Sequence, residues 1–433
     1  MKKDFIAELK WRRMLQDAMP GTEELLQKEM VSAYIGFDPT ADSLGVGNLV
    51  QIMTLLHFQN CGHKPIALVG GATGMVGDPS GKSAERNLLD ETTLNHNLAC
   101  QRKQLERFLN FDCGANSAEI VNNYDWFKGM SFLEFIRDIG KHLTVNYMMA
   151  KDSVKNRISG EDREGMSFTE FAYQLVQGFD FYYLWKNKGV KMQMGGSDQW
   201  GNIVTGTELI RRKDGGEAWA LVTPLIKKAD GTKFGKTESG NVWLDPKRTS
   251  PYEFYQFWLN AADSDSENYI RIFTLKGQEE IEKLETEHKL EPHLRKLQKA
   301  LAEDITARVH GAEALKAVQE VTALLMSKDA VQMMEAADET SLAKTILASG
   351  TRSVSIPKAE FEKGIGAIEV LNQRTSMFES NGDAMKMMKG NGVSFNKVKA
   401  TDPKMILNTS NLIKGKFLLV QKGKNDYCVV VVN

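Results

Sequence analysis

Two lysines three residues apart, Lys233 and Lys236, lie among small and polar residues in Lys233-Phe-Gly-Lys-Thr237. An apolar run, residues 221–226, and a turn precede them. Because the segment offers no apolar face to bury, we expect a mobile surface loop. Lysines on such a loop can close over a polyphosphate and neutralise charge that develops as a phosphate leaves. The alternative is a solvated basic turn, which is what most isolated lysine pairs are.

A second set of polar side chains has helical spacing. Tyr173, Gln177 and Asp180 fall at positions i, i+4 and i+7, so they share one face of a helix. Ser167-Phe-Thr-Glu170 has the sequence of a capping box and predicts the start of that helix. A phenol, an amide and a carboxylate on one face indicate a pocket for a zwitterionic small molecule. Residues that only rim a core are the alternative.

Other polar residues lie where strands are expected to end. Asp78 and Asp198 fall on loops that follow two predicted strands, although an aspartate before a helix is often only its N-cap. Tyr34 lies inside the first predicted strand, where tyrosine is ordinarily a core residue. Three further residues open the first helix of the sheet, near its positive end: Thr40, Gly47 and Asn48.

Three glycine patterns resemble nucleotide-binding motifs but lack a required residue. Val50 stands where the third glycine of a dinucleotide fingerprint belongs. Val76 and Asp230 stand where the first glycine of a Walker A loop would precede Gly81-Lys82-Ser83 and Gly235-Lys236-Thr237. The sequence therefore contains neither motif. Glycine-rich loops at strand ends remain, and these bind phosphates through main-chain N–H groups.

Strands and helices alternate in the first half of the chain. Apolar strands are expected at residues 31–37, 65–69, 120–123 and 190–194, each followed by a loop and a helix. Such alternation is typical of a doubly wound parallel α/β sheet, whose ligand lies beyond the carboxyl ends of the strands. Apolar helices in residues 124–165 are read as an insertion whose surface faces a partner subunit.

Composition and charge limit the class of protein. The chain has 433 residues, 42% of them hydrophobic and 26% charged, and no apolar run long enough to span a membrane. Its four cysteines are scattered and predict no metal site, and no apolar signal segment is present, so we expect a cytoplasmic protein. Residues 351–433 hold 13 lysines and arginines against 7 acidic residues, a charge of +6. The rest of the chain must then carry −7, which predicts a polyanionic partner for the tail.

Seven segments in chain order resemble the bacterial tyrosyl-tRNA synthetases, a family of class I aminoacyl-tRNA synthetases. Several long blocks in the right order along nearly the whole chain are more specific than any single motif. The segments are Ile35-Gly-Phe-Asp-Pro-Thr-Ala-Asp-Ser-Leu44, Ala67-Leu-Val-Gly-Gly-Ala-Thr-Gly74, Val76-Gly-Asp-Pro-Ser-Gly-Lys82, Val145-Asn-Tyr-Met-Met-Ala-Lys151, Gly195-Gly-Ser-Asp-Gln-Trp-Gly-Asn202, Ala229-Asp-Gly-Thr-Lys-Phe-Gly-Lys-Thr237 and Ser250-Pro-Tyr-Glu-Phe-Tyr-Gln-Phe-Trp258.

The resemblance implies a role for each candidate residue. Tyr34 and Asp180 would bind the phenol of a tyrosine substrate, and Asp78, Tyr173 and Gln177 would bind its ammonium group. The implied tyrosine site is completed by Gln193 and Gln199. The implied ATP site comprises Gly36, Asp38, Gly47, Gly196, Asp198 and Lys236. The implied catalytic residues are Thr40, Asn48, Lys233, Lys236 and Thr237, the last three matching the family's Lys-Met-Ser-Lys-Ser loop, which grips pyrophosphate.

The same resemblance implies the domains, the reaction and the partners. It divides the chain into a Rossmann-like catalytic domain (1–245), a helical domain (246–348) and a small α+β S4-like RNA-binding tail (349–433). The polar composition of residues 349–360, with serine, threonine and lysine, separately predicts a linker. Tyrosine would be activated by ATP, which carries Mg²⁺ as its counterion, and then transferred to tRNA(Tyr). No protein-bound metal is expected, and the insertion would form a homodimer contact.

One motif departs from the family. The family's His-Ile-Gly-His motif reads Gly45-Val-Gly-Asn48 in this sequence. Asn48 can still supply a hydrogen bond, whereas Gly45 has no side chain to touch the leaving phosphates. By analogy with the removal of one oxyanion donor, we expect a loss on the order of 10²-fold in the activation rate. Thr40 and the two lysines would then carry that charge.

Three alternatives remain at this stage. A synthetase specific for tryptophan is disfavoured by the pair Tyr34 and Asp180, because indole has no hydroxyl. An RNA-binding protein that has lost catalysis is supported only by Gly45, while Lys233 and Asp78 argue against it. A nicotinamide-dependent dehydrogenase is disfavoured by Val50.

Overall fold

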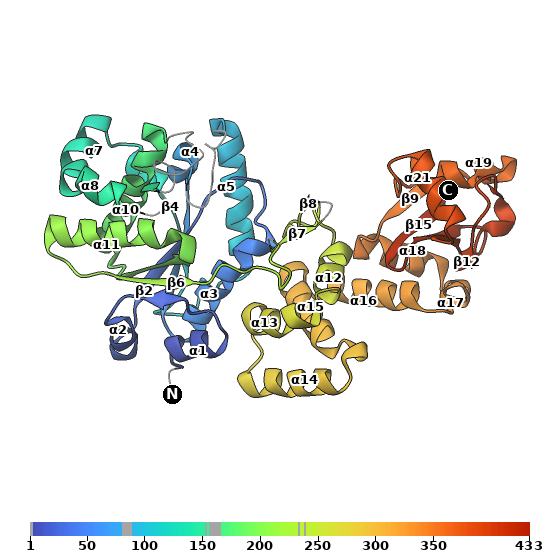
Figure 1. The fold of residues 1–433 in the computed structure, drawn as a ribbon, viewed down its shortest axis with the longest axis horizontal. Coiled ribbons are helices and arrows are strands. Elements are labelled where there is room, and N and C mark those ends of the chain that lie inside the picture. Colours follow the sequence, from blue (N-terminus) through green and yellow to red (C-terminus); the bar gives the residue numbers. More distant parts are fainter. Residues whose placement is uncertain (1–2, 80–88, 152–153, 156–165, 233, 238–239) are drawn as a thin grey trace. The chain divides into compact units, whose positions relative to one another are not determined.

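The computed structural model describes residues 3–79, 89–151, 154–155, 166–232, 234–237 and 240–433 (Figure 1). Its internal contacts divide the chain into two compact units. Unit 1 comprises residues 1–244 and 262–297, and unit 2 comprises residues 245–261 and 298–433. The chain therefore changes unit after residues 244, 261 and 297. The three-part division expected from the sequence stays a prediction.

A six-stranded sheet forms the centre of unit 1. Its strands are β1 (Asp17–Ala18), β2 (Ser32–Phe37), β3 (Lys64–Val69), β4 (Glu119–Asn122), β5 (Met192–Gly196) and β6 (Trp219–Thr223). They lie in the order β1-β6-β5-β2-β3-β4, and only the edge pair β1–β6 is antiparallel. In the register of the central strands, Tyr34 pairs with Ile66 on one side and Gln193 on the other. The predicted doubly wound parallel sheet is thus confirmed.

Helices and short turns connect these strands. The helices of unit 1 are α1 (Phe5–Trp11), α2 (Thr22–Lys28), α3 (Leu49–Asn60), α4 (Thr73–Val76), α5 (Glu91–Leu105), α6 (Tyr124–Phe127), α7 (Phe132–Asp138), α8 (Val145–Met149), α10 (Phe168–Lys188), α11 (Trp200–Asp214), α13 (Asp263–Phe273) and α14 (Gln278–Leu290). Single 3-10 turns at Val46–Asn48, Gly140–His142, Ser197–Gln199 and Pro292–Leu294 precede or join some of them. Tyr34 and Ile66 pack with Phe181 and Leu184 of α10, so this helix covers one face of the sheet.

Helix α10 begins and ends where the sequence predicts. The Ser167 hydroxyl accepts from the Glu170 N–H at 3.2 Å, and the Glu170 carboxylate accepts from the Ser167 N–H at 3.2 Å, which completes the capping box. Gly189, with φ of +65°, ends the helix in the left-handed region that favours glycine. The helix is long enough to carry three predicted site residues into the core of unit 1.

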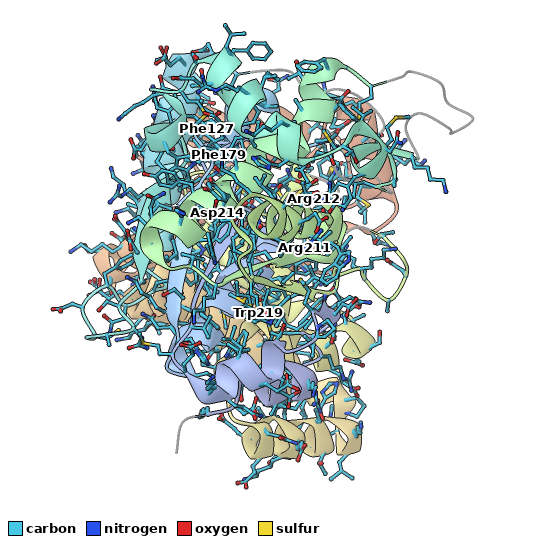
Figure 2. The ribbon with its side chains drawn as sticks, turned by 90° about the vertical axis from the view of Figure 1, so that its left-hand side faces the viewer. Phe127, Phe179, Arg211, Arg212, Asp214 and Trp219 are labelled. Atoms are coloured by element: carbon cyan, nitrogen blue, oxygen red, sulfur yellow. The ribbon has the colours of Figure 1, made fainter. Side chains whose placement is uncertain are left out.

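The insertion between β4 and α10 packs on α10 through aromatic rings. Phe127 lies edge-on to Phe179 with ring centroids 5.3 Å apart (Figure 2). Ile139, Leu143 and Met148 join the same buried cluster. Other apolar side chains of this insertion remain exposed on the single chain: Phe132, Leu133, Ile136, Val145 and Met149.

The segment that carries the lysine pair is better packed than we expected. The hairpin β7 (Lys236–Thr237) and β8 (Gly240–Asn241) follows the turn at residues 229–232. Phe234 is only 6% exposed, because its ring packs against Tyr269 and Phe273 of α13. The expectation that this segment has no apolar group to bury was therefore wrong. Lys233 lies outside the described residues.

Unit 2 combines helices with a small sheet. Its helices include α12 (Pro251–Leu259), α15 (Lys296–His310), α16 (Ala312–Met326), α17 (Ala330–Ala336) and α18 (Glu339–Ser349). The tail contains α19 (Lys358–Lys363), α20 (Ala367–Glu369), a π-helical turn at Val370–Arg374, α21 (Asn381–Lys389) and a 3-10 turn at Thr409–Asn411. Its five-stranded sheet has the order β12-β11-β14-β15-β9, and β10 (Ile365–Gly366) pairs with β13 (Ile406–Leu407). The strands of the five-stranded sheet are β9 (Ser353–Ile356), β11 (Val393–Phe395), β12 (Val398–Lys399), β14 (Phe417–Lys422) and β15 (Asp426–Val432).

The segment expected to be a linker is part of this sheet. Strand β9 lies within residues 349–360 and pairs in parallel with β15, with Val354 opposite Val430. The linker is predicted from the serine, threonine and lysine content of this segment, and the short Ser-Val-Ser-Ile strand has such polar residues at alternate positions. The prediction of a linker was wrong, because an edge strand needs only one apolar face.

Candidate active site

A cavity of about 310 Å³ opens at the carboxyl ends of β2 and β5. Ligands of open parallel sheets bind in this position. The predicted site residues that line it are Tyr34, Gly36, Asp38, Thr40, Gly47, Asn48, Asp78, Tyr173, Gln177, Asp180, Gln193, Gly196, Asp198 and Gln199. The structure therefore brings together all the predicted residues outside the lysine segment.

The deep end of the cavity is built around Asp180. Its carboxylate is 1% exposed and accepts from Asn123 Nδ2 at 3.0 Å and from Trp126 Nε1 at 2.9 Å. Burial raises the pKa of Asp180 to about 8 despite these two donors. The hydroxyl of Tyr34, also buried, has no hydrogen-bond partner within the described part of the chain. This end thus offers a carboxyl group and a phenol to a polar ligand.

Asn123 and Trp126 were not among the predicted residues. They follow β4 directly, at the same carboxyl edge of the sheet that holds the other loops. Their place after a strand was therefore the one signal available in the sequence. Their spacing does not reveal that both side chains turn toward α10.

The middle of the cavity is acidic. Asp38 accepts from the Tyr173 hydroxyl at 3.2 Å and from the Thr73 hydroxyl at 2.8 Å, and Asp78 accepts from Gln199 Nε2 at 2.8 Å. Burial and the neighbouring Asp38 raise the pKa of Tyr173 well above its ordinary value, so its phenol stays protonated. Gln177 Oε1 is buried without a hydrogen-bond partner among the described residues. Such an arrangement of carboxylates and amide oxygen suits a cationic group.

The outer end of the cavity is lined by main chain. A Cβ on Gly196 would lie 2.6 Å from Asp198 Oδ1, so any larger residue there would displace the Asp198 carboxylate. Burial, with a smaller contribution from Asp78, raises the pKa of Asp198. Gln193 Oε1 is a further buried acceptor that pairs with no described group. Close main-chain approach and unpaired polar atoms fit a ligand rich in hydrogen-bonding groups.

The turn at Gly45–Asn48 forms one wall of this outer end. Asn48 Oδ1 accepts from the Gly45 N–H at 3.0 Å, so the side-chain carbonyl caps its own turn, and the residue is exposed. A Cβ at position 45 would lie 3.3 Å from the Val242 carbonyl oxygen. The rate loss expected from Gly45 stays a prediction.

Lys236 does not line the cavity. Its side chain is exposed, and its carbonyl oxygen accepts from Lys228 Nζ at 3.2 Å. The neighbouring Gly235 nevertheless lies close to Val46 and to the main chain of Gly47, and Gly47 lines the cavity. The side chain of Thr237, like Lys233, lies outside what the structure describes.

The parallel sheet, the cavity at its switch point and the glycine turns are those of a class I aminoacyl-tRNA synthetase. The family model described as "tRNA synthetases class I (W and Y)" matches residues 26–327. A second model, "Tyrosine--tRNA ligase SYY-like C-terminal domain", matches residues 348–430.

Curated relatives narrow the family further. The Tyrosine--tRNA ligase of Bacteroides thetaiotaomicron is 56% identical over 429 residues, 99% of each chain. That of Porphyromonas gingivalis is 57% identical over 430 residues, 99% of this chain and 100% of the relative. A C-terminally truncated mitochondrial tyrosyl-tRNA synthetase from Aspergillus nidulans superposes with a TM-score of 0.67 and 31% identity, over 75% of this chain and 94% of that one. The chain belongs to the tyrosine–tRNA ligases.

The described residues also bear on membrane spanning and on metal binding. Among the described helices, none is both long and apolar enough to cross a bilayer. Within the same residues, histidine, cysteine and acidic side chains form no group that could hold a metal ion.

Proposed function

We propose that the cavity binds L-tyrosine beside Mg-ATP and joins them as tyrosyl-adenylate, which the chain then uses to charge tRNA(Tyr). The observation that carries this proposal is a set of three buried oxygens without partners in the described chain, all lining one cavity: Tyr34 Oη, Gln177 Oε1 and Gln193 Oε1. A buried polar atom left unpaired costs about 1–3 kcal/mol, so these atoms favour a ligand that pairs with them.

The shape of tyrosine fits the order of these groups. Its phenol pairs with Tyr34 and Asp180 at the deep end, and its ammonium group pairs with Asp78, Tyr173 and Gln177 in the acidic middle. Its carboxylate then points to the outer end, next to Gln193 and Gln199. Phenylalanine would leave Tyr34 and Asp180 unpaired, and this penalty is the basis for its rejection.

ATP occupies the outer end in this proposal. Its ribose and phosphates lie along the main chain of Gly36, Gly47 and Gly196 and near the carboxylates of Asp38 and Asp198. Thr40 and Asn48 donate to the phosphates, and Lys233, Lys236 and Thr237 neutralise the departing pyrophosphate. Magnesium arrives with ATP as part of the substrate.

The reaction needs no nucleophile from the protein. One oxygen of the tyrosine carboxylate attacks the α-phosphorus in line, the bond to the bridging oxygen breaks, and pyrophosphate leaves. A hydroxyl at the 3′ end of the tRNA then attacks the carbonyl carbon of the adenylate and releases AMP. Positioning and charge stabilisation supply the rate.

The tail is assigned to tRNA binding. Its formal charge of +6 opposes a chain that is otherwise acidic, and a cationic surface provides the salt-dependent part of binding to a phosphate backbone. The S4-like RNA-binding character expected from the sequence belongs to this proposal. We place the reaction in the cytoplasm, where tRNA is charged.

The insertion is assigned to a homodimer contact. Exposed apolar side chains gather on α7 and α8, with Leu133 77% and Phe132 65% exposed on the single chain. Contiguous apolar surface of this kind marks protein contacts, and a second copy of the chain is the commonest occupant.

Pyrophosphate exchange into ATP tests the activation step. Tyrosine, tryptophan and phenylalanine are supplied in parallel, and exchange with tyrosine alone is expected. Asp180→Asn should reduce the preference for tyrosine over phenylalanine, because it removes the carboxylate that faces the phenol. Absence of exchange with all three amino acids, in a folded protein that still binds tRNA, would leave only a non-catalytic RNA-binding function.

A further inference from the structure

The lysine segment, residues 229–237, is fastened to α13 by a buried aromatic side chain. The Phe234 ring lies 5.0 Å from the Tyr269 ring and stacks on the Phe273 ring at 5.4 Å, with 15° between their planes. The segment is tied to the same helix at its start, where the Ala229 N–H donates to Asp265 Oδ1 at 2.7 Å. Helix α13 is therefore the element on which this segment packs.

The opposite side of the segment approaches the Val46–Asn48 turn, of which Gly47 and Asn48 line the cavity. A Cβ on Gly235 would lie 2.9 Å from Val46 Cγ2, and the φ of Gly235 is +80°, so only glycine allows this approach. Gly235 O accepts from the Val242 N–H at 3.0 Å, and Val242 O accepts from the Val46 N–H at 3.0 Å. Lys236, the next residue along, is consequently held beside the turn that we assign to ATP.

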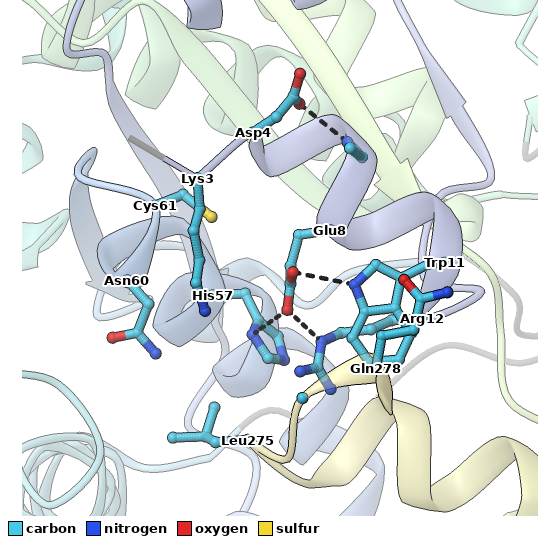
Figure 3. Close-up of a pocket in the computed structure, with 12 residues that line it drawn as sticks. Lys3, Asp4, Glu8, Trp11, Arg12, His57, Asn60, Cys61, Leu275 and Gln278 are labelled. Carbon is cyan, nitrogen blue, oxygen red and sulfur yellow. Dashed lines mark hydrogen bonds and ion pairs between the residues drawn. The ribbon is translucent and has the colours of Figure 1, made fainter. Parts of the chain in front are cut away.

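Helix α13 is itself held in place by Arg12, which follows α1. The buried Arg12 guanidinium donates to the carbonyls of Arg271 at 2.6 Å, Thr274 at 2.9 Å and Lys276 at 2.8 Å. Its Nε donates to Glu8, which also accepts from Trp11 Nε1 (Figure 3). The carboxyl end of α13 is thereby fixed to α1 within unit 1.

We propose that Phe234 is a positioning residue for tyrosine activation: buried on α13, it sets where Lys236 stands relative to the Val46–Asn48 turn. The inference rests on the proposed function of that turn and that lysine. Without the ring, two glycines and several polar residues leave the segment many arrangements of similar energy. Misplacing a group that stabilises charge by about 1 Å can cost on the order of 10²-fold in rate.

The first test compares Phe234→Ala with Phe234→Met in the full chain. For Phe234→Ala, kcat of pyrophosphate exchange should fall about 10- to 100-fold while the Kd for tyrosine stays unchanged. Phe234→Met should recover most of the rate, because methionine refills an apolar site with a flexible side chain of similar reach. Full activity of Phe234→Ala, alongside a slow Lys236→Ala variant, would overturn the inference. A Lys236→Ala variant with wild-type rate would instead remove the proposed role of the loop.

The second test distinguishes packing of Phe234 on α13 from a direct contact between Phe234 and ATP. Phe273→Leu changes the α13 surface on which Phe234 packs and keeps that buried site apolar. It should slow pyrophosphate exchange in the same way as Phe234→Ala. In the double variant, Phe234→Ala should add little to the effect of Phe273→Leu. Independent effects that multiply would mean that Phe234 acts elsewhere than on α13.

A third measurement does not depend on activity. Hydrogen–deuterium exchange of the Val242 amide, which donates to Gly235, should speed up in Phe234→Ala and not in Lys236→Ala. Unchanged exchange in Phe234→Ala would show that the ring does not hold the segment.

Discussion

At the scale of single residues, we expect the protonation of Asp180 to be coupled to ligand binding. Burial sets its pKa at about 8 in the free protein, whereas the ordinary value is 3.8. A phenol that donates to the carboxylate favours the ionised form, so the pKa of the complex must be lower than that of the free protein. With the phenol of tyrosine placed on Asp180, as we propose, binding is expected to release a proton wherever the pH lies between the two values.

This linkage predicts that tyrosine binds more tightly as pH rises. The Kd should fall as the pH rises toward about 8, the pKa of the free carboxyl group, and level off above it. Isothermal titration calorimetry in two buffers of different ionisation enthalpy measures both the Kd and the protons released. Asp180→Asn is the control and should show no such slope. A wild-type Kd that is constant or increases with pH would contradict the assignment of Asp180 to the phenol.

Helical spacing was enough to group some site residues before the fold was known. Tyr173, Gln177 and Asp180 share a face because residues three and four apart do so in any α-helix, and all three line the cavity. Trp126 could not be found in this way. Its indole reaches Asp180 through the packing of two distant segments, and no local spacing encodes such a contact.

At the scale of elements, the hydrogen bonds of Arg12 join α1 to α13, and their removal is expected to reduce stability strongly. Arg12→Met keeps the length and apolar stem of the side chain but removes the donor to three carbonyl groups and leaves Glu8 with only the Trp11 hydrogen bond among those described. Removing one partner of a buried charged pair costs about 3–5 kcal/mol. Urea unfolding, followed through the transition of unit 1, should show a loss of that size.

The matched control lies two residues earlier on the same helix. Lys10 pairs with Glu23 at 3.1 Å, but both side chains are about half exposed. Lys10→Met should therefore cost less than about 1 kcal/mol. Equal losses for the two variants would indicate that the buried carbonyl contacts of Arg12 contribute nothing specific.

Elements with strong local signals were predicted well, and the others were not. The capping box of α10 defined where that helix begins, because its hydrogen bonds depend only on neighbouring residues. Strand β9 was missed, since its pairing with β15 is made across most of the tail and its four residues carry few apolar groups. Phe234 was missed for a similar reason: its partners lie on a helix far along the chain.

At the scale of the whole molecule, the exposed side chains of α7 predict how the chain assembles. Leu133→Asp places a charge at the centre of the proposed contact and should convert a particle of twice the 48.5 kDa chain mass into single chains. Size-exclusion chromatography with light scattering measures this mass. Leu347→Asp, at a leucine 78% exposed on α18, is the control and should leave the mass unchanged. A mass that Leu133→Asp does not alter would place the dimer contact elsewhere.

Because the two units alternate along the chain, their segments are also made in alternation during synthesis. The ribosome completes the sequence of unit 1 only at residue 297, after it has already released α12, which belongs to unit 2. Helix α12 bonds to α16, where Gln256 donates to Thr322, and it buries Phe254 and Trp258 fully. At about 5–20 residues per second, several seconds pass before α16 emerges. During that interval the aromatic side chains of α12 are exposed on the nascent chain, because the residues of α16 that it packs against have not yet been made.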